Sequence, residues 1–234
     1  MCSLKNVFRR IKYGVRYNSD SYINYLKKLG VTIGERTTIF DPKSTIIDET
    51  RPWMIKIGKD VQITAGVTIL THGYDWSVLK GVYGEVLGSA GQVEIGNNVF
   101  IGMHTTILKG VHIGNNVIIG ANALVNKDIP DNCVVAGNPC RIVMSLEKYY
   151  EKRKAAQLDE AIEMVKLYRQ RTGKEVNENV LREFFWLFTD QLDNMPKIWK
   201  DMNSLVGNRE YSEEVMRKHE IRFKNMSAFL DSIK

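Results

Sequence analysis

The chain has 234 residues, of which 44% are hydrophobic and 26% are charged, a balance typical of one globular domain or two small ones. The longest apolar runs fall short of 18 residues, which excludes a transmembrane helix, and the first 20 residues lack the apolar core of a secretory signal. The three cysteines, Cys2, Cys133 and Cys140, form no CxxC pair. We therefore expect neither a disulfide scaffold nor a structural zinc site, and a reducing, cytoplasmic location.

Basic residues are concentrated at the start of the chain. Residues 1–30 hold seven lysines and arginines and one acidic residue, Asp20, so they account for the whole formal net charge of +6. Ser19–Ser21 is expected to cap a helix that ends at Gly30. A basic helical head is compatible with an ordinary solvated helix face, and it can also meet a membrane surface or an acidic partner. Because no nucleic-acid motif accompanies it, we expect no nucleic-acid partner.

A six-residue period organises the middle of the chain. Ile or Val opens the hexads that begin at residues 57–69 and again those that begin at residues 95–125, as in IGKDVQ, IGNNVF and IGANAL, and Ile33-Gly34 keeps the same phase. This period fits neither a helix nor a single strand, but it fits short strands joined by tight turns. Each hexad then forms one flat wall, and three walls form a coil with its aliphatic residues inside. The hexads run on through GNPCRI, which ends at Ile142.

Two segments interrupt the hexads. Residues 71–92 carry five glycines and predict a long loop outside the coils, and a smaller interruption covers residues 45–54. After Arg141 the chain is expected to be helical. One helix covers Leu146–Arg171, a second starts at Asn177 or Asn179 and carries the apolar residues up to Phe188, and a last one runs from Ser212 towards Ile233.

The hexads, Thr71-His72 at the loop, and the closing residues 126–130 and 135–139 together resemble the hexapeptide-repeat acyltransferases. The resemblance covers residues 31–142 and is nearest to the maltose, galactoside, capsule and lipopolysaccharide sugar O-acetyltransferases. It implies a mainly β fold, a left-handed parallel β-helix, that forms homotrimers with active sites between subunits and uses acetyl-CoA. The expected organisation is a basic helical segment (1–30), the β-helix (31–144, with loop 71–92) and a helical extension (145–234).

His72 is the candidate general base. Acyl transfer to a hydroxyl needs a group that removes the acceptor proton, and the pKa of imidazole suits that task. His72 stands where the loop begins, and the resemblance places the catalytic histidine at this position. Glu85 is expected to orient it or to bind the acceptor, and Asp75 is the alternative orienting carboxylate and a candidate for acceptor binding. Asp48 is expected to contact the acceptor. Trp76 and Tyr83 are candidates for stacking on a sugar.

The resemblance also implies contacts to CoA. Met103 and Ala121 match the pantetheine path, and Asn126 and Lys127 match a Thr-Lys pair near the adenine, with Asn in place of Thr. Arg141 is a candidate phosphate contact, although Lys127 and Arg141 are also compatible with ordinary solvated charge. No metal is expected.

The predicted function is acetyl-CoA-dependent O-acetylation of a sugar hydroxyl in a polysaccharide or oligosaccharide precursor. Two alternatives remain open at this point. The acceptor can be an antibiotic, an amino sugar or serine, or the chain can be a non-catalytic or zinc-dependent β-helix protein. His104 and His112 are eight residues apart and no other histidines are close in sequence, which argues against a catalytic zinc site with three histidine ligands.

Overall fold

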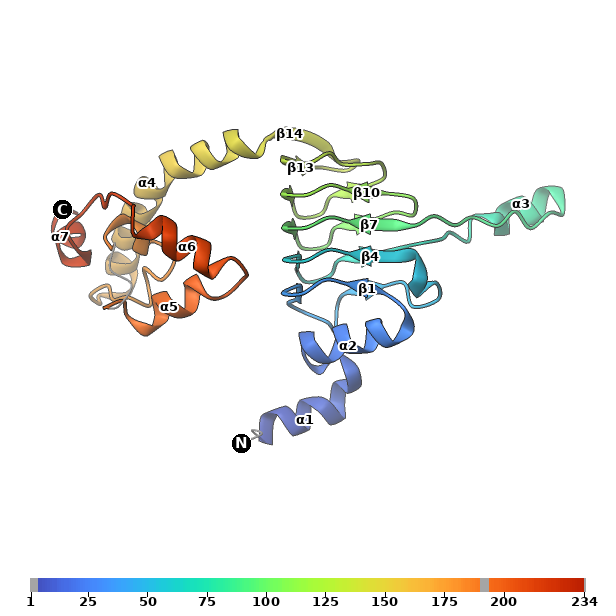
Figure 1. The fold of residues 1–234 in the computed structure, drawn as a ribbon, viewed down its shortest axis with the longest axis horizontal. Coiled ribbons are helices and arrows are strands. Elements are labelled where there is room, and N and C mark those ends of the chain that lie inside the picture. The colour runs from blue at the N-terminus through green and yellow to red at the C-terminus, as the bar shows by residue number, and fades with distance from the viewer. Residues whose placement is uncertain (1–3, 190–193, 234) are drawn as a thin grey trace. The chain divides into compact units, whose positions relative to one another are not determined.

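The six-residue period folds into short strands stacked in three flat walls (Figure 1). The computed structural model describes residues 4–189 and 194–233. Each turn of the chain visits sheet A, then sheet B, then sheet C, and successive turns pair in parallel. Sheet A contains β1 (Thr32–Ile33), β4 (Ile55–Ile57), β7 (Val93–Ile95) and β10 (His112–Ile113). Sheet B contains β2 (Thr38–Ile39), β5 (Gln62–Ile63), β8 (Val99–Ile101), β11 (Val117–Ile119), β13 (Cys133–Ala136) and β14 (Arg141–Ser145). Sheet C contains β3 (Ile46–Ile47), β6 (Thr68–Ile69), β9 (Thr106–Ile107) and β12 (Leu124–Val125).

The aliphatic residue that opens each hexad points into the prism. Ile57, Ile63 and Ile69 are at most 1% exposed, as are their counterparts Ile95 and Ile101 in the next turn. Branched side chains suit such short, half-buried strands, and each fully buried one contributes about 1.5–3 kcal/mol. The predicted parallel β-helix is therefore confirmed, and its core is a stack of isoleucine and valine layers.

Glycine is required at one corner of the prism because successive turns touch there. A Cβ on Gly34 would lie 2.5 Å from the backbone of Gly58, and a Cβ on Gly96 would lie 2.6 Å from the carbonyl oxygen of Gly114. The neighbouring corner position adopts positive φ in turn after turn, and asparagine supplies it at Asn98 and Asn116. These two side chains also join through a 2.9 Å hydrogen bond, so the corner carries an amide ladder.

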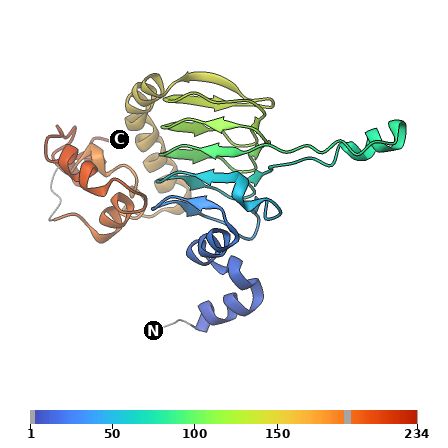
Figure 2. The same ribbon diagram turned by 45° about the vertical axis from the view of Figure 1, so that its right-hand side comes forward.

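The glycine-rich loop leaves the prism as an arm. Figures 1 and 2 both show residues between β6 and β7 extending away from the walls, with the short helix α3 (Trp76–Tyr83) near the tip. The sequence predicted a loop without this helix. The smaller interruption also differs from expectation, because residues 45–54 contain β3 and a 3₁₀ turn at Pro52–Met54.

The last turn ends with a reversal of the chain. β14 runs antiparallel to β13, with Ala136 opposite Arg141, and so covers the edge of sheet B. The expected hexad GNPCRI is therefore not a further wall, because residues 137–140 turn the chain back. Antiparallel pairing satisfies backbone groups that a free edge strand would leave open.

The basic head is helical and packs on the first turn of the prism. It contains α1 (Leu4–Tyr13), a 3₁₀ turn (Gly14–Tyr17) and α2 (Ser19–Leu29). Gly30 ends α2 with φ 115°, as expected, but Asn18 rather than Ser19–Ser21 caps it, because its side chain accepts from the Ser21 N–H. Tyr22 and Leu26 are fully buried against the prism core.

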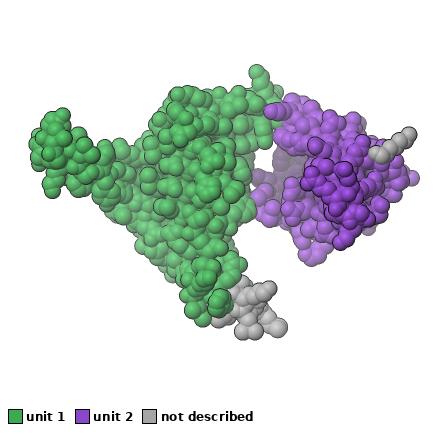
Figure 3. Space-filling view, turned by 180° about the vertical axis from the view of Figure 1, so that it is seen from behind, with its two compact units in different colours: residues 1–149 green, residues 150–234 purple. Residues whose placement is uncertain are grey.

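Residues 150–234 form a second compact unit (Figure 3). This unit has its own apolar core. Its helices are α4 (Leu146–Thr172, which begins in the first unit), α5 (Lys197–Asn203), α6 (Arg209–Met216) and α7 (Met226–Asp231). α4 confirms the long predicted helix. The second predicted helix is wrong, since residues 177–188 form turns and a 3₁₀ turn at Phe185–Leu187. The single last helix is also wrong, because residues 217–225 separate α6 from α7.

Membrane spanning has no support in the described parts of the chain. None of the helices there combines the length and the apolar character that crossing a bilayer requires.

The glycine column gives a test of the stacking. We expect Gly96→Ala to lower the free energy of unfolding by about 1–3 kcal/mol, because the new Cβ meets a backbone carbonyl that cannot move independently. Gly81→Ala is the control, since a Cβ at that exposed position meets nothing within 4 Å. Urea unfolding monitored by circular dichroism measures both variants. Equal midpoints would contradict a required glycine at the corner.

Candidate active site

His72 lies where the chain leaves sheet C for the arm, two residues after Leu70. One turn away in the same sheet, β3 pairs with β6, and this register brings Asp48 beside it. His72 Nδ1 and Asp48 Oδ2 are 2.6 Å apart, and the two side chains are 11% and 3% exposed. The imidazole edge opposite this contact carries Nε2, which has no hydrogen-bond partner among the described residues. Asp48 therefore holds the candidate base at Nδ1, and Nε2 is available to accept a proton.

Asp48 is held by donors on both of its oxygens. Oδ1 accepts from the Thr50 N–H at 2.9 Å and from the Thr50 hydroxyl at 2.6 Å. Oδ2 accepts from the N–H and the hydroxyl of Thr71 as well as from His72. Burial alone would raise the pKa of Asp48, but the hydrogen bonds from Thr50, Thr71 and His72 outweigh it and hold that pKa well below its usual range.

The ionised carboxylate determines the form of His72. Because ionised Asp48 can only accept, Nδ1 of His72 carries the hydrogen, and the lone pair of the neutral ring is on Nε2. A carboxylate that orients an imidazole in this way also stabilises the imidazolium formed when Nε2 takes a proton. The pair can therefore act as an oriented general base.

The head fixes the segment that carries Asp48. Glu49 accepts hydrogen bonds from Arg16, Tyr22 and Tyr25, at 2.8, 3.3 and 3.0 Å. Arg16 also donates to the backbone carbonyl of Thr45 at 2.7 Å. Burial, opposed by the charge of Arg16, raises the pKa of Tyr22 to about 12, so its hydroxyl remains a donor. Part of the charge of the head is therefore used to anchor this segment.

The arm starts and returns beside His72. His72 pairs with Ala90 across the base of the arm, and the Gly91 N–H donates to the Thr71 carbonyl at 2.9 Å. The rings of His72 and Tyr74 meet edge to face, with centroids 5.0 Å apart. A Cβ on Gly91 would lie 2.6 Å from the backbone N of Gly110, so the returning end of the arm lies directly against the next turn.

The arm residues singled out by sequence do not contact His72 in the described structure. Asp75 precedes α3, Trp76 starts it, Tyr83 ends it with 72% exposure, and Glu85 follows it as an exposed residue. The expectation that Glu85 or Asp75 orients His72 needs correction, because Asp48 holds that position. Asp48 itself was expected at the acceptor. Trp76 meets Tyr74, with ring centroids 6.0 Å apart.

The candidate CoA-binding residues lie at the two ends of the strands of sheet C. Met103 and Ala121 stand on successive turns where the chain enters this sheet, linked by the Asn122 N–H to the Met103 carbonyl at 2.8 Å. At the same end, the Leu124 N–H of β12 donates to the Gly137 carbonyl and the Cys140 N–H donates to the Leu124 carbonyl, and Arg141 follows this turn. Asn126 and Lys127 stand where the chain leaves the sheet. All five side chains belong to exposed residues.

Sequence reasoning missed several members of the site. Thr50 and Thr71 hold Asp48, and Tyr74 contacts His72. Lys109 also went unnoticed, although it lies 18 residues before Lys127 and therefore one turn away at the same corner of sheet C. The 18-residue spacing was the available signal for Lys109.

The other prism histidines belong to corners and walls. His104 has positive φ, and its ring lies where a side chain on Gly66 would otherwise be. His112 opens β10 on sheet A, and its Nδ1 is 3.6 Å from Glu94. Across the described ranges 4–189 and 194–233, no group of three His, Cys, Asp or Glu side chains is arranged to hold a metal ion.

Known proteins match the repeated part of the chain. The family model described as bacterial transferase hexapeptide (six repeats) matches residues 92–127. Protein CapG of Staphylococcus aureus is 43% identical over 128 residues, which cover 54% of this chain and 73% of that protein. Galactoside O-acetyltransferase of Escherichia coli is 39% identical over 109 residues, which cover 45% of this chain and 51% of that protein.

A solved structure of a galactoside acetyltransferase in complex with coenzyme A is also similar. It is 26% identical, with 64% of this chain and 86% of that chain covered and a TM-score of 0.43.

The extent of the match to CapG shows the family. The chain belongs to the hexapeptide-repeat family of bacterial transferases, and its fold is the left-handed parallel β-helix. Membership of this family also confirms the prediction that the protein is an acyltransferase.

Asp48→Asn tests the electrostatics of the pair. A lowered pKa means that Asp48 stabilises the fold above the usual aspartate pKa of about 3.9, and that this stabilisation is lost as pH falls towards the folded-state value. The wild type should therefore lose stability below about pH 4 more steeply than Asp48→Asn. Thermal unfolding between pH 3 and 7 measures this slope. Asp75→Asn, which removes an exposed arm carboxylate, should keep the wild-type slope; a flattened slope there would contradict the assignment.

Proposed function

We propose that the protein transfers an acetyl group from acetyl-CoA to a hydroxyl of a sugar or glycan precursor. The observation that carries this proposal is the buried His72–Asp48 pair, which leaves Nε2 free to accept a proton at the base of the arm. The names of the relatives support the class of acceptor, since galactoside O-acetyltransferase is among them. Serine, an antibiotic and an amino sugar are the alternative acceptors, and a panel of acceptors distinguishes them from a sugar hydroxyl.

In the proposed reaction His72 moves one proton twice. The acceptor hydroxyl attacks the thioester carbonyl carbon as its proton passes to Nε2 of His72. The C–S bond then breaks, the ester forms, and the imidazolium returns the proton to the leaving CoA sulfur. Asp48 stays ionised throughout and stabilises the imidazolium between the two transfers.

The same proposal places CoA along the outside of sheet C. Met103 and Ala121 would contact the pantetheine, and Asn126 and Lys127 the adenine end. Arg141 and the neighbouring Lys109 would offer positive charge to phosphates. Each of these residues is exposed and free of an ion pair within the described structure.

The exposed arm supports the proposed homotrimer. Val78, Val82 and Tyr83 of α3 are 68%, 68% and 72% exposed, and Val86 and Leu87 beyond α3 are also more than half exposed. A group of apolar side chains of this kind on an extended arm favours burial against another protein surface. A second copy of the chain is the proposed surface. Asp75, Trp76, Tyr83 and Glu85 would then face an acceptor held between subunits.

Replacement of the base tests the function. With acetyl-CoA, a panel of sugars, serine and amino sugars, and a thiol reagent that detects free CoA, we expect His72→Ala to lose about 10²–10⁴-fold in kcat. Its molar mass by light scattering should match that of the wild type. His112→Gln is the control, because His112 is exposed on sheet A. Near-normal turnover by His72→Ala would remove His72 from the mechanism, and a wild type that releases no CoA with any hydroxyl acceptor would refute the function.

The head also supports contact with an anionic membrane surface. α1 contains four basic residues and no acidic one, while Phe8 and Ile11 are 67% and 80% exposed. A short helix that combines exposed apolar side chains with a basic face is typical of interfacial binding. The free thiols of Cys133 and Cys140 fit the cytoplasmic side.

Vesicle sedimentation tests this contact. We expect the protein to bind vesicles that contain phosphatidylglycerol and not vesicles of phosphatidylcholine alone. Arg9→Gln with Arg10→Gln should weaken binding by roughly tenfold or more, since each basic residue near the surface contributes about 1 kcal/mol. Lys27→Gln with Lys28→Gln in α2 is the matched control. Equal loss in both double variants would indicate net charge alone rather than a contact made by α1.

A further inference from the structure

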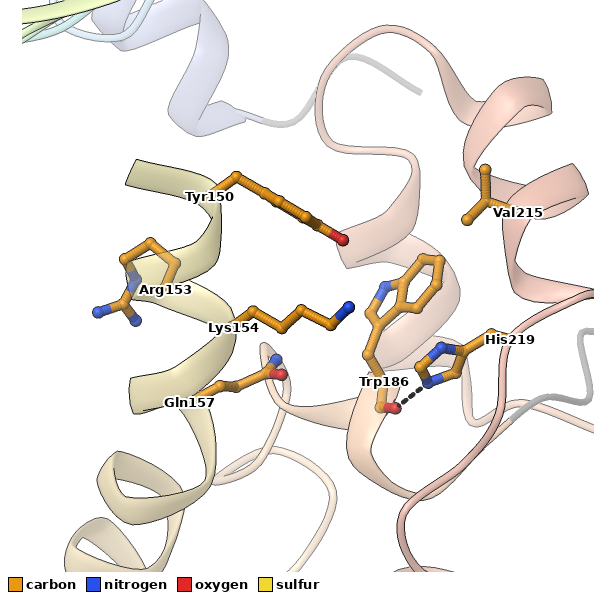
Figure 4. A pocket seen from close by; sticks show the side chains of 7 residues that line it. All are labelled: Tyr150, Arg153, Lys154, Gln157, Trp186, Val215 and His219. Carbon is orange, nitrogen blue, oxygen red and sulfur yellow. Dashed lines mark hydrogen bonds between the residues drawn. The ribbon is translucent and has the colours of Figure 1, made fainter. Parts of the chain in front are cut away.

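The second compact unit contains a cavity whose lining includes none of the residues of the proposed acetyl transfer. It has a volume of about 400 Å³, within the range of about 300–1,000 Å³ for small-molecule sites. Tyr150, Lys154 and Gln157 reach it from successive turns of α4. Trp186, Val215 and His219 face them from the other side, as Figure 4 shows.

Several hydrogen-bonding groups converge in this cavity without a partner. Figure 4 shows the Lys154 ammonium and the Tyr150 hydroxyl directed towards the indole of Trp186, with the Gln157 amide beside them. Among the described residues none of these four side chains has a hydrogen-bond partner. The amine of Lys154 lies 5.7 Å from the centre of the Tyr150 ring, which keeps it over the cavity wall. All four of these side chains carry donors, and the described residues supply no acceptor for them.

The walls of the cavity are aromatic and are held in place. His219 Nε2 contacts the Trp186 carbonyl at 2.6 Å, and the two rings meet edge to face with centroids 5.0 Å apart. Trp186 therefore has a fixed orientation towards α4. Flat aromatic faces offer apolar contact to a ring-shaped ligand, and the indole N–H adds a donor at its edge.

The charges of the lining select the ligand further. The residues that line the cavity in the described structure include Lys154 and Arg153 but no carboxylate. Arg153 binds Glu160, and Figure 4 shows its guanidinium turned away, so Lys154 supplies the positive charge inside. A ligand that matches has an apolar ring face, hydroxyls for Gln157 and Tyr150, and an anionic group for Lys154 and the indole N–H.

We propose that this cavity binds an acidic saccharide, a sugar ring that carries a carboxylate, as part of a glycan chain. The sugar ring packs on Trp186 and Tyr150, its carboxylate accepts from Lys154 and the Trp186 N–H, and its hydroxyls pair with the Gln157 amide. The C-terminal unit then holds a glycan independently of acetyl transfer. The proposal uses no residue of the β-helix and stands without the proposed function.

Calorimetry with the full chain and no acetyl-CoA tests the proposal. The probes are a tetrasaccharide of hexuronic acid, a neutral hexose tetrasaccharide of equal length, and a nucleoside diphosphate. We expect the acidic tetrasaccharide to bind and the neutral one to bind at least about tenfold more weakly, because the charge-assisted hydrogen bonds are missing. Lys154→Gln should weaken the acidic probe by about tenfold, and Trp186→Phe should weaken it while circular dichroism stays unchanged.

Two control variants make the result specific. Lys152→Gln removes an exposed lysine of the same helix outside the cavity lining and should bind like the wild type. His72→Ala should also bind like the wild type, so that loss of acetyl transfer and loss of this site are distinguished. Absent binding of the acidic probe, equal binding by Lys154→Gln, or tighter binding of the nucleoside diphosphate with the same dependence on Lys154 would each overturn the saccharide assignment.

Discussion

The close contact between successive turns of the prism is the constraint on which the rest of this structure depends. At the corner that contains Gly34, Gly58, Gly96 and Gly114, the backbones approach so closely that a Cβ has no room. This contact fixes the register, because a turn displaced by one residue would bring a branched side chain to the corner and a glycine to the core. Every pairing between residues 18 or 24 positions apart follows from it.

The chemistry of the site is a consequence of that register. Asp48 and His72 are 24 residues apart, and they meet because β3 and β6 pair in parallel. The donors that keep Asp48 ionised come from both sides of the same pairing, Thr50 on one turn and Thr71 on the other. An orienting carboxylate is therefore provided by the repeat itself, and the imidazole needs no carboxylate from the arm.

The β-helix was predicted from the sequence, because the six-residue period is set by the length of one strand plus one corner of the prism. The orienting residue was expected on the arm, because Asp75 and Glu85 are carboxylates of the loop that His72 begins and Gly84-Glu85 resembles a pair in related enzymes. The carboxylate at His72 is instead Asp48, whose contact arises across turns. The C-terminal unit was harder still. The apolar run that ends at Phe188 resembles a helix face, yet its side chains fill the core from turns, and no repeat indicates where such turns fall.

Repetition also limits what the prism can recognise. In each wall the same few positions of the hexad point outward in every turn. Such a surface can align a general base with a long, extended substrate, but it has little freedom to distinguish one ligand from another. Selectivity then has to come from segments that break the period, and this chain has three: the head, the arm and the C-terminal unit. The cavity between α4 and Trp186 fits that division under the proposal made for it, because its donors and aromatic walls would recognise a ligand by shape and charge. Under the two proposals made above, the residues that transfer the acetyl group are fixed by the stacking of turns, and the residues that bind a glycan belong to a segment that this stacking does not constrain, so the two sets can change independently.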